Sequence, residues 1–61
     1  MRTICVWVND VKRSHEVAEM ICFAFPCFVS VHSMGSGILE IEVTCREEDV
    51  AAIECRLSEI V

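Results

Sequence analysis

The sequence has few basic residues, and it lacks any motif that would hold a catalytic group, a metal or a cofactor. Five Lys and Arg stand against ten Asp and Glu, which gives a formal net charge of −5. Binding to a phosphate backbone requires clustered Lys and Arg, and crossing a bilayer requires roughly 20 consecutive apolar residues. The chain has neither. We therefore expect a protein that is not an enzyme, carries no cofactor or metal, and binds neither nucleic acid directly nor a membrane.

The cysteines do not follow the pattern of a disulfide scaffold. Their number is odd, no two of them form a C-x-x-C pair, and residues 1–4 do not begin an apolar signal-peptide region. These features predict a cytoplasmic protein with reduced thiols. The five are Cys5, Cys22, Cys27, Cys45 and Cys55.

The length predicts a single compact domain that spans residues 1–61. A chain of this size buries only about 60% of its unfolded surface, so its core is marginal without an oligomer, a partner or a disulfide. The hydrophobic fraction is nevertheless 54%. Part of the apolar surface should therefore face another protein.

The negative charge is distributed unevenly. Residues 1–31 carry three basic and three acidic residues, whereas residues 32–61 carry two basic and seven acidic ones. An acidic surface permits binding to a basic protein surface with electrostatic steering. A solvated acidic surface with no partner is the simpler alternative.

The clearest local pattern is a strand followed directly by a helix. Residues 39–44 alternate between apolar and polar side chains, which is typical of a strand with one buried face. Thr44 precedes Glu47 by three residues, the spacing of a capping box. We expect a helix over about residues 45–60, with Val50, Ile53, Leu57 and Ile60 on its buried stripe.

The remaining elements follow from composition and from turn residues. A strand is expected at residues 3–8, then a helix that begins at Asp10 or at Ser14, since both are good N-cap types. Pro26 ends this helix. Its buried face should hold Val17, Met20, Ile21 and Ala24.

A second strand at residues 27–32 and a glycine-containing turn at residues 33–37 predict an antiparallel hairpin with the strand that follows.

The resulting β-α-β-β-α order is that of a ferredoxin-like split unit of the α+β class without its last strand. A right-handed crossover places the third strand between the first two, in a mixed or antiparallel three-stranded sheet with both helices on one face. The first strand is then an unprotected edge. The other face of the sheet should display Cys5, Trp7, Phe28, His32, Ile38, Glu40 and Glu42.

Several polar and aromatic residues could have a catalytic or binding role, or could be ordinary residues of the surface or the core. His15 and His32 are the only imidazoles, but they fall on opposite sides of the expected fold, so we interpret both as surface residues. Glu40 and Glu42 are about 7 Å apart along one strand face, and strand alternation alone explains them. Trp7 fits the core of a dimer, a hot spot for a partner, or a buried position if the two sheet faces are assigned wrongly.

The order of elements resembles that of amino-acid-binding ACT domains, which implies a dimer formed through sheet edges and a small metabolite bound between subunits. The chain departs from that family in lacking a fourth strand and the usual glycine of the first loop, where Asn9 and Asp10 stand.

In size, acidity and lack of an active site, the chain also resembles small phage-encoded anti-CRISPR proteins. That resemblance implies an inhibitor that imitates nucleic acid and occupies the basic channel of a nucleic-acid-binding complex. This is our leading functional hypothesis. The ACT-like module is the alternative, and a subunit that completes a larger assembly by pairing its first strand is a third possibility. A homodimer through the first strand or through the open sheet face is also a possible association. The expected partner-binding residues are Glu40, Glu42, Glu47, Glu48, Asp49, Glu54, Glu59, Trp7 and Phe28.

Overall fold

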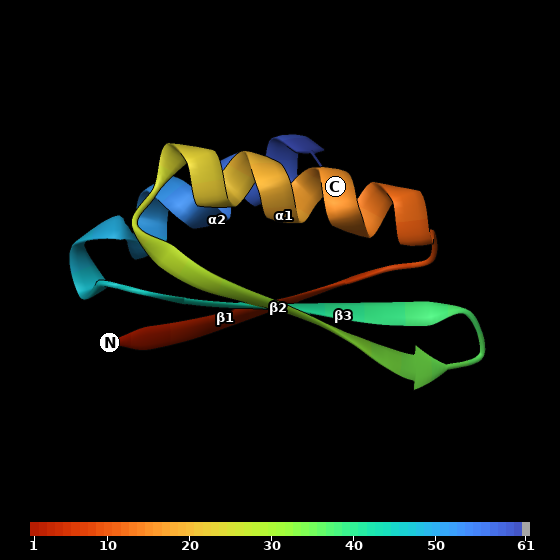
Figure 1. Ribbon diagram of the computed structural model, residues 1–61. Helices are drawn as coiled ribbons and strands as arrows, with labels where there is room; N and C mark the ends of the chain where they lie inside the picture. Colours follow the sequence, from red (N-terminus) through yellow and green to blue (C-terminus); the bar gives the residue numbers. More distant parts are fainter. Residues whose placement is uncertain (61) are drawn as a thin grey trace.

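The computed structural model describes residues 1–60 and confirms the expected fold class (Figure 1). Three strands form an antiparallel sheet in the order β1-β3-β2. The two helices lie together over one face of this sheet (Figure 1). The elements are β1 (Arg2–Val8), α1 (Val11–Ala24), β2 (Cys27–Gly35), β3 (Ile38–Cys45), a short 3₁₀ turn η1 (Glu47–Asp49) and α2 (Val50–Ile60).

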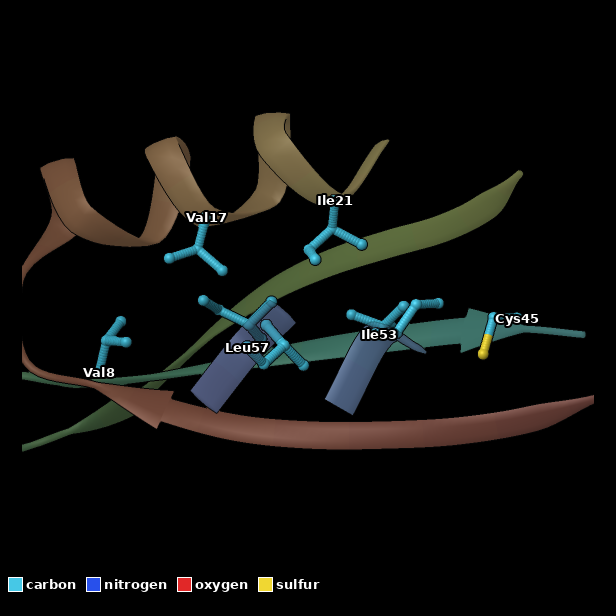
Figure 2. Close-up of a cluster of buried hydrophobic side chains, with 8 residues drawn as sticks. Val8, Val17, Ile21, Cys45, Ile53 and Leu57 are labelled. Carbon is cyan, nitrogen blue, oxygen red and sulfur yellow. The ribbon is translucent and has the colours of Figure 1, made fainter. Parts of the chain in front are cut away.

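The core lies between the sheet and the two helices (Figure 2). Alternation along β3 directs Ile41, Val43 and Cys45 toward the helices, and all three are fully buried. Figure 2 shows side chains of α1 pointing toward the sheet, and α2 contributes to the same cluster. Each fully buried Val, Ile or Leu contributes about 1.5–3 kcal/mol. The apolar helix residues buried in this cluster are Val17, Ile21, Ile53 and Leu57.

Helix α1 begins after Asp10, which decides between the two expected N-caps. The Asp10 carboxylate accepts a hydrogen bond from the Lys12 backbone N–H at 2.9 Å. Ser14 lies one turn inside the helix, where its hydroxyl donates to the Val11 carbonyl oxygen at 2.6 Å. Ser14 is fully buried. The small polar residue therefore fills a core position that the apolar pattern did not indicate.

The expected buried face of α1 is partly wrong. Ser14, Val17 and Ile21 form the buried stripe, whereas Met20 is 45% exposed and Ala24 is also exposed. The buried stripe is narrow because the sheet has only three strands, so residues beside the line from Ser14 to Ile21 face solvent.

The expected capping box at Thr44 and Glu47 is wrong. Strand β3 continues to Cys45, and the Thr44 hydroxyl lies on the sheet surface, 3.5 Å from the Thr3 hydroxyl. Arg46 precedes η1 without a side-chain capping bond. Burial of Cys45, which pairs with both neighbouring strands, keeps Thr44 in the sheet.

Helix α2 starts at Val50, five residues later than expected. Its Ile53 and Leu57 are buried as predicted, and Val50 is partly buried. The prediction for the Ile60 side chain lies outside the described part of the chain.

The expected hairpin is confirmed, with a tighter turn than predicted. Strand β2 reaches Gly35 through an irregularity between Ser33 and Gly35, and β3 begins at Ile38. The two connecting residues both have positive φ, 55° at Ser36 and 78° at Gly37. This geometry suits a type I′ turn, whose twist matches that of the strands it joins.

Candidate protein-binding face

The sheet face opposite α1 and α2 is the candidate site, and we refer to it as the open face. Strand alternation and the observed register place on it the seven side chains that the sequence predicted there. These seven are Cys5, Trp7, Phe28, His32, Ile38, Glu40 and Glu42; the smaller polar residues Thr3, Ser30 and Thr44 lie on the same face.

The register arranges these residues in rows across the three strands. Glu40 lies between Trp7 on β1 and His32 on β2. One row along the sheet, Glu42 lies between Cys5 and Ser30. Directly opposed side chains in antiparallel strands are close enough to interact. The two carboxylates therefore occupy the centre of the open face.

The apolar members of the open face are well exposed. Trp7 is 58% exposed, Phe28 is 72% exposed and Ile38 is 42% exposed. Exposure of Trp7 excludes the interpretation in which the two sheet faces are exchanged. An aromatic side chain has a large contact area and little conformational entropy to lose, which suits it to an interface.

A shallow hollow of about 400 Å³ lies beside Trp7 at the end of the sheet. Trp7, Val8 and Ile38 of the sheet line it. Asn9 from the turn after β1 and Arg13 from the first turn of α1 complete the lining. No local sequence pattern associates Arg13 with Trp7 and Ile38. Only the tertiary placement of α1 brings it there.

A thiol and two carboxylates converge on the open face. The Cys5 Sγ and one carboxylate oxygen each from Glu40 and Glu42 all lie within 4.8 Å of one another. Loss of hydration, together with the negative charges of Glu40 and then Glu42, raises the pKa of the Cys5 thiol. These three atoms could act as ligands to a cation. Cys5 is exposed and the two glutamates are half-buried.

The seven predicted acidic residues do not form one surface. Glu40 and Glu42 lie on the open face, where neither forms a salt bridge within residues 1–60. The acids of η1 are paired: Glu47 with Arg2 at 2.9 Å, and Glu48 and Asp49 with Arg46 at 3.5 and 3.0 Å.

The remaining two predicted acids, Glu54 and Glu59, are exposed on α2. Cys55 is also exposed there, and its thiol lies 4.0 Å from a Glu59 carboxylate oxygen. Since α2 covers the opposite side of the sheet, these acids cannot contact the same flat partner surface as Glu40 and Glu42.

A second apolar area lies on the helix side, and the sequence analysis did not select it. Phe23 on α1 is 91% exposed. It lines a groove of about 290 Å³ with Ala18, Glu19, Cys22 and Val29, between α1 and β2. The sequence does contain a pattern that predicts exposure of Phe23, because this residue falls outside the helical stripe of Val17 and Ile21.

The cysteines are free throughout the described chain. Cys27 and Cys45 face each other across β2 and β3, and Cys27 donates weakly to the Ile21 carbonyl oxygen at 3.8 Å. Loss of hydration, with smaller contributions from Cys22, Cys45 and Asp49, raises the pKa of the Cys27 thiol. A raised pKa favours the less reactive protonated form.

No helix within residues 1–60 is long and apolar enough to span a membrane. Comparison with known proteins found no matching family model, no similar curated protein and no similar solved structure.

Proposed function

We propose that this protein is a non-enzymatic binding module whose open face docks on a basic protein surface. The observation that carries the proposal is the composition of that face. Exposed Trp7 and Phe28 lie beside Glu40 and Glu42, two carboxylates without a salt bridge in the described chain, on a sheet surface that no helix covers.

The two kinds of residue would have different roles in binding. Burial of aromatic anchors supplies most of the affinity of a typical interface. Carboxylates mainly accelerate encounter with a basic partner and fix the orientation of the complex. Because Glu40 and Glu42 are half-buried before any partner binds, part of their hydration is already lost. A partner Arg or Lys would compensate for that loss.

The more specific form of the proposal is that the partner surface otherwise binds nucleic acid. The module would then act as an inhibitor by occupying that surface and excluding the nucleic acid. The negative charge of the open face supports this form. Pairing of Glu47, Glu48 and Asp49 with arginines lowers their expected contribution, so Glu40 and Glu42 should dominate.

The test is quantitative binding of the tagged protein to a nucleic-acid-binding partner captured from lysate at low salt. The doubly substituted Glu40→Gln/Glu42→Gln variant and the Trp7→Ala variant should each weaken binding by at least tenfold, which is about 1.4 kcal/mol. Glu54→Gln/Glu59→Gln is the matched control, since it removes the same charge from α2. It should leave the affinity nearly unchanged.

Three outcomes would contradict the proposal. One is an equal loss of affinity in Glu40→Gln/Glu42→Gln and in Glu54→Gln/Glu59→Gln, because net charge alone would then explain binding. Another is binding that salt and Trp7→Ala leave unchanged. The third is thermal stabilisation by free amino acids with no protein partner captured, which would favour the ACT-like alternative.

A further inference from the structure

Strand β1 is an edge of the sheet. It pairs with β3 on one side, and within residues 1–60 no strand pairs with its other side. The outward backbone N–H and C=O groups of an edge strand form a template for another strand. The strand spans seven residues, Arg2–Val8.

The opposite edge of the sheet, β2, has features that oppose pairing with another chain. Pro26 directly precedes it. Its pairing with β3 is irregular between Ser33 and Gly35, and such irregularities twist an edge away from a flat partner. Strand β1 has a continuous register with β3 from Arg2 to Val8 and contains no proline.

We propose that two copies of this chain form a dimer by antiparallel pairing of their β1 edges. Complete overlap of a seven-residue strand with itself places its central residue, Cys5, on the two-fold axis. Ile4 of each copy then lies opposite Val6 of the other, on the helix side of the sheet. The strand's single charged residue, Arg2, lies opposite Val8 and never opposite a second arginine.

Self-complementarity is the reason for choosing a second copy as the occupant. Like charges directly opposite each other destabilise a strand pair, whereas β-branched pairs stabilise it. The self-pairing of β1 places no like charges opposite each other. It forms the β-branched pair of Ile4 and Val6 twice, because a two-fold axis repeats every contact.

An apolar groove beside β1 supports the same arrangement. Ile4, Val6 and Leu57 line a space of about 300 Å³ between β1 and α2, with Glu54 and Ser58 also in its lining. Two-fold pairing brings the grooves of the two copies together along the axis. The dimer would thus bury partly exposed Ile4 and Val6, which a monomer leaves half-covered.

The dimer also changes the open face. Six strands would form one sheet with the order β2-β3-β1 in one copy continuing into β1-β3-β2 in the other. Both helix layers lie on the same side, so the two open faces become one surface with a Trp7 on each side of the axis.

The first experiment is sedimentation of the reduced protein over a range of concentrations. We expect a monomer–dimer equilibrium, and we expect Val6→Lys to weaken dimerisation at least tenfold, because it places a charge beside the pairing edge. Val31→Lys is the matched control. Val31 is a helix-facing valine on the β2 edge and is 36% exposed, so this variant should dimerise as the unmodified chain does.

A second measurement does not depend on how well Val6→Lys folds. Mild oxidation with copper-phenanthroline should trap a covalent dimer whose linked peptides both contain Cys5. Cys5→Ser should abolish this product, and Cys55→Ser, which removes another exposed thiol, should not. A monomer at every concentration would overturn the proposal. So would a dimer that forms no Cys5 link and responds equally to Val6→Lys and Val31→Lys.

Discussion

Cys5 shows how the sheet register defines the chemical environment of one side chain. It lies opposite Glu42 and diagonally from Glu40, so its ionisation would place a third negative charge between two existing ones. Loss of hydration and these two carboxylates both favour the neutral thiol, which is why the pKa is raised. At pH 8, Cys5 should therefore have a smaller thiolate fraction than an ordinary cysteine.

Removing the two charges should accelerate alkylation of Cys5. In Glu40→Gln/Glu42→Gln the pKa of the thiol falls toward its ordinary value, and the thiolate fraction at pH 8 rises. We expect a several-fold faster reaction with iodoacetamide, measured by mass spectrometry of the Cys5 peptide in dilute protein. Glu19→Gln on α1 is the control and should not change the rate. A rate that is the same in all three proteins would show that the carboxylates do not influence this thiol.

The sequence was enough to predict which face of the sheet each strand residue occupies. It was not enough to predict which charged residues form salt bridges. Period-two alternation was enough to place Trp7, Glu40 and Glu42 on one side of the sheet. The pairing of Arg2 with Glu47 joins residues that are 45 positions apart in the sequence. It depends on Arg2 lying opposite Cys45 in the sheet, and no local pattern contains that information.

Among the elements, the start of α1 is the one whose capping can be tested most directly. Asp10 has an extended backbone, and its carboxylate satisfies the Lys12 N–H. Asp10→Ala leaves that N–H without its partner, and we expect a loss of about 0.5–2 kcal/mol in the free energy of unfolding. Urea denaturation measures this difference.

Asp10→Asn provides the comparison, because an asparagine side chain also caps helices well. It should retain most of the stability that Asp10→Ala loses. Equal losses in the two variants would show that the Asp10 charge, and not its capping bond, stabilises the helix start.

Of the two helix-capping patterns in the sequence, Asp10 caps a helix and Thr44 does not, because Thr44 belongs to a strand. Asp10 follows a strand that has already ended, so its side chain is available to the helix. Thr44 and Glu47 have a suitable spacing, yet burial of Cys45 extends β3 past Thr44. The spacing of Thr44 and Glu47 alone does not reveal that burial of Cys45 between the other two strands is favoured over a helix cap.

At the scale of the whole molecule, the small size of the core should make stability sensitive to association. Domains have free energies of unfolding of about 0.05–0.15 kcal/mol per residue, which gives about 3–9 kcal/mol for this length. If only folded chains associate into a dimer, the unfolding temperature rises as the protein concentration increases.

We therefore expect the unfolding temperature of the reduced protein to rise by several degrees across a hundredfold range of concentration. Calorimetry or circular dichroism measures this shift. Val6→Lys should remove the concentration dependence, and Val31→Lys should preserve it. A single unfolding temperature at all concentrations would agree only with a monomer.

The position of β3 also affects how the chain is made. It is the central strand in space and the last of the three in sequence. As the chain leaves the ribosome, β1 and β2 emerge first, and they are not neighbours in the sheet. No native strand pair can form until residues 38–45 are available. A chain that stops before Ile38 would leave β1 and β2 without the strand with which each of them pairs.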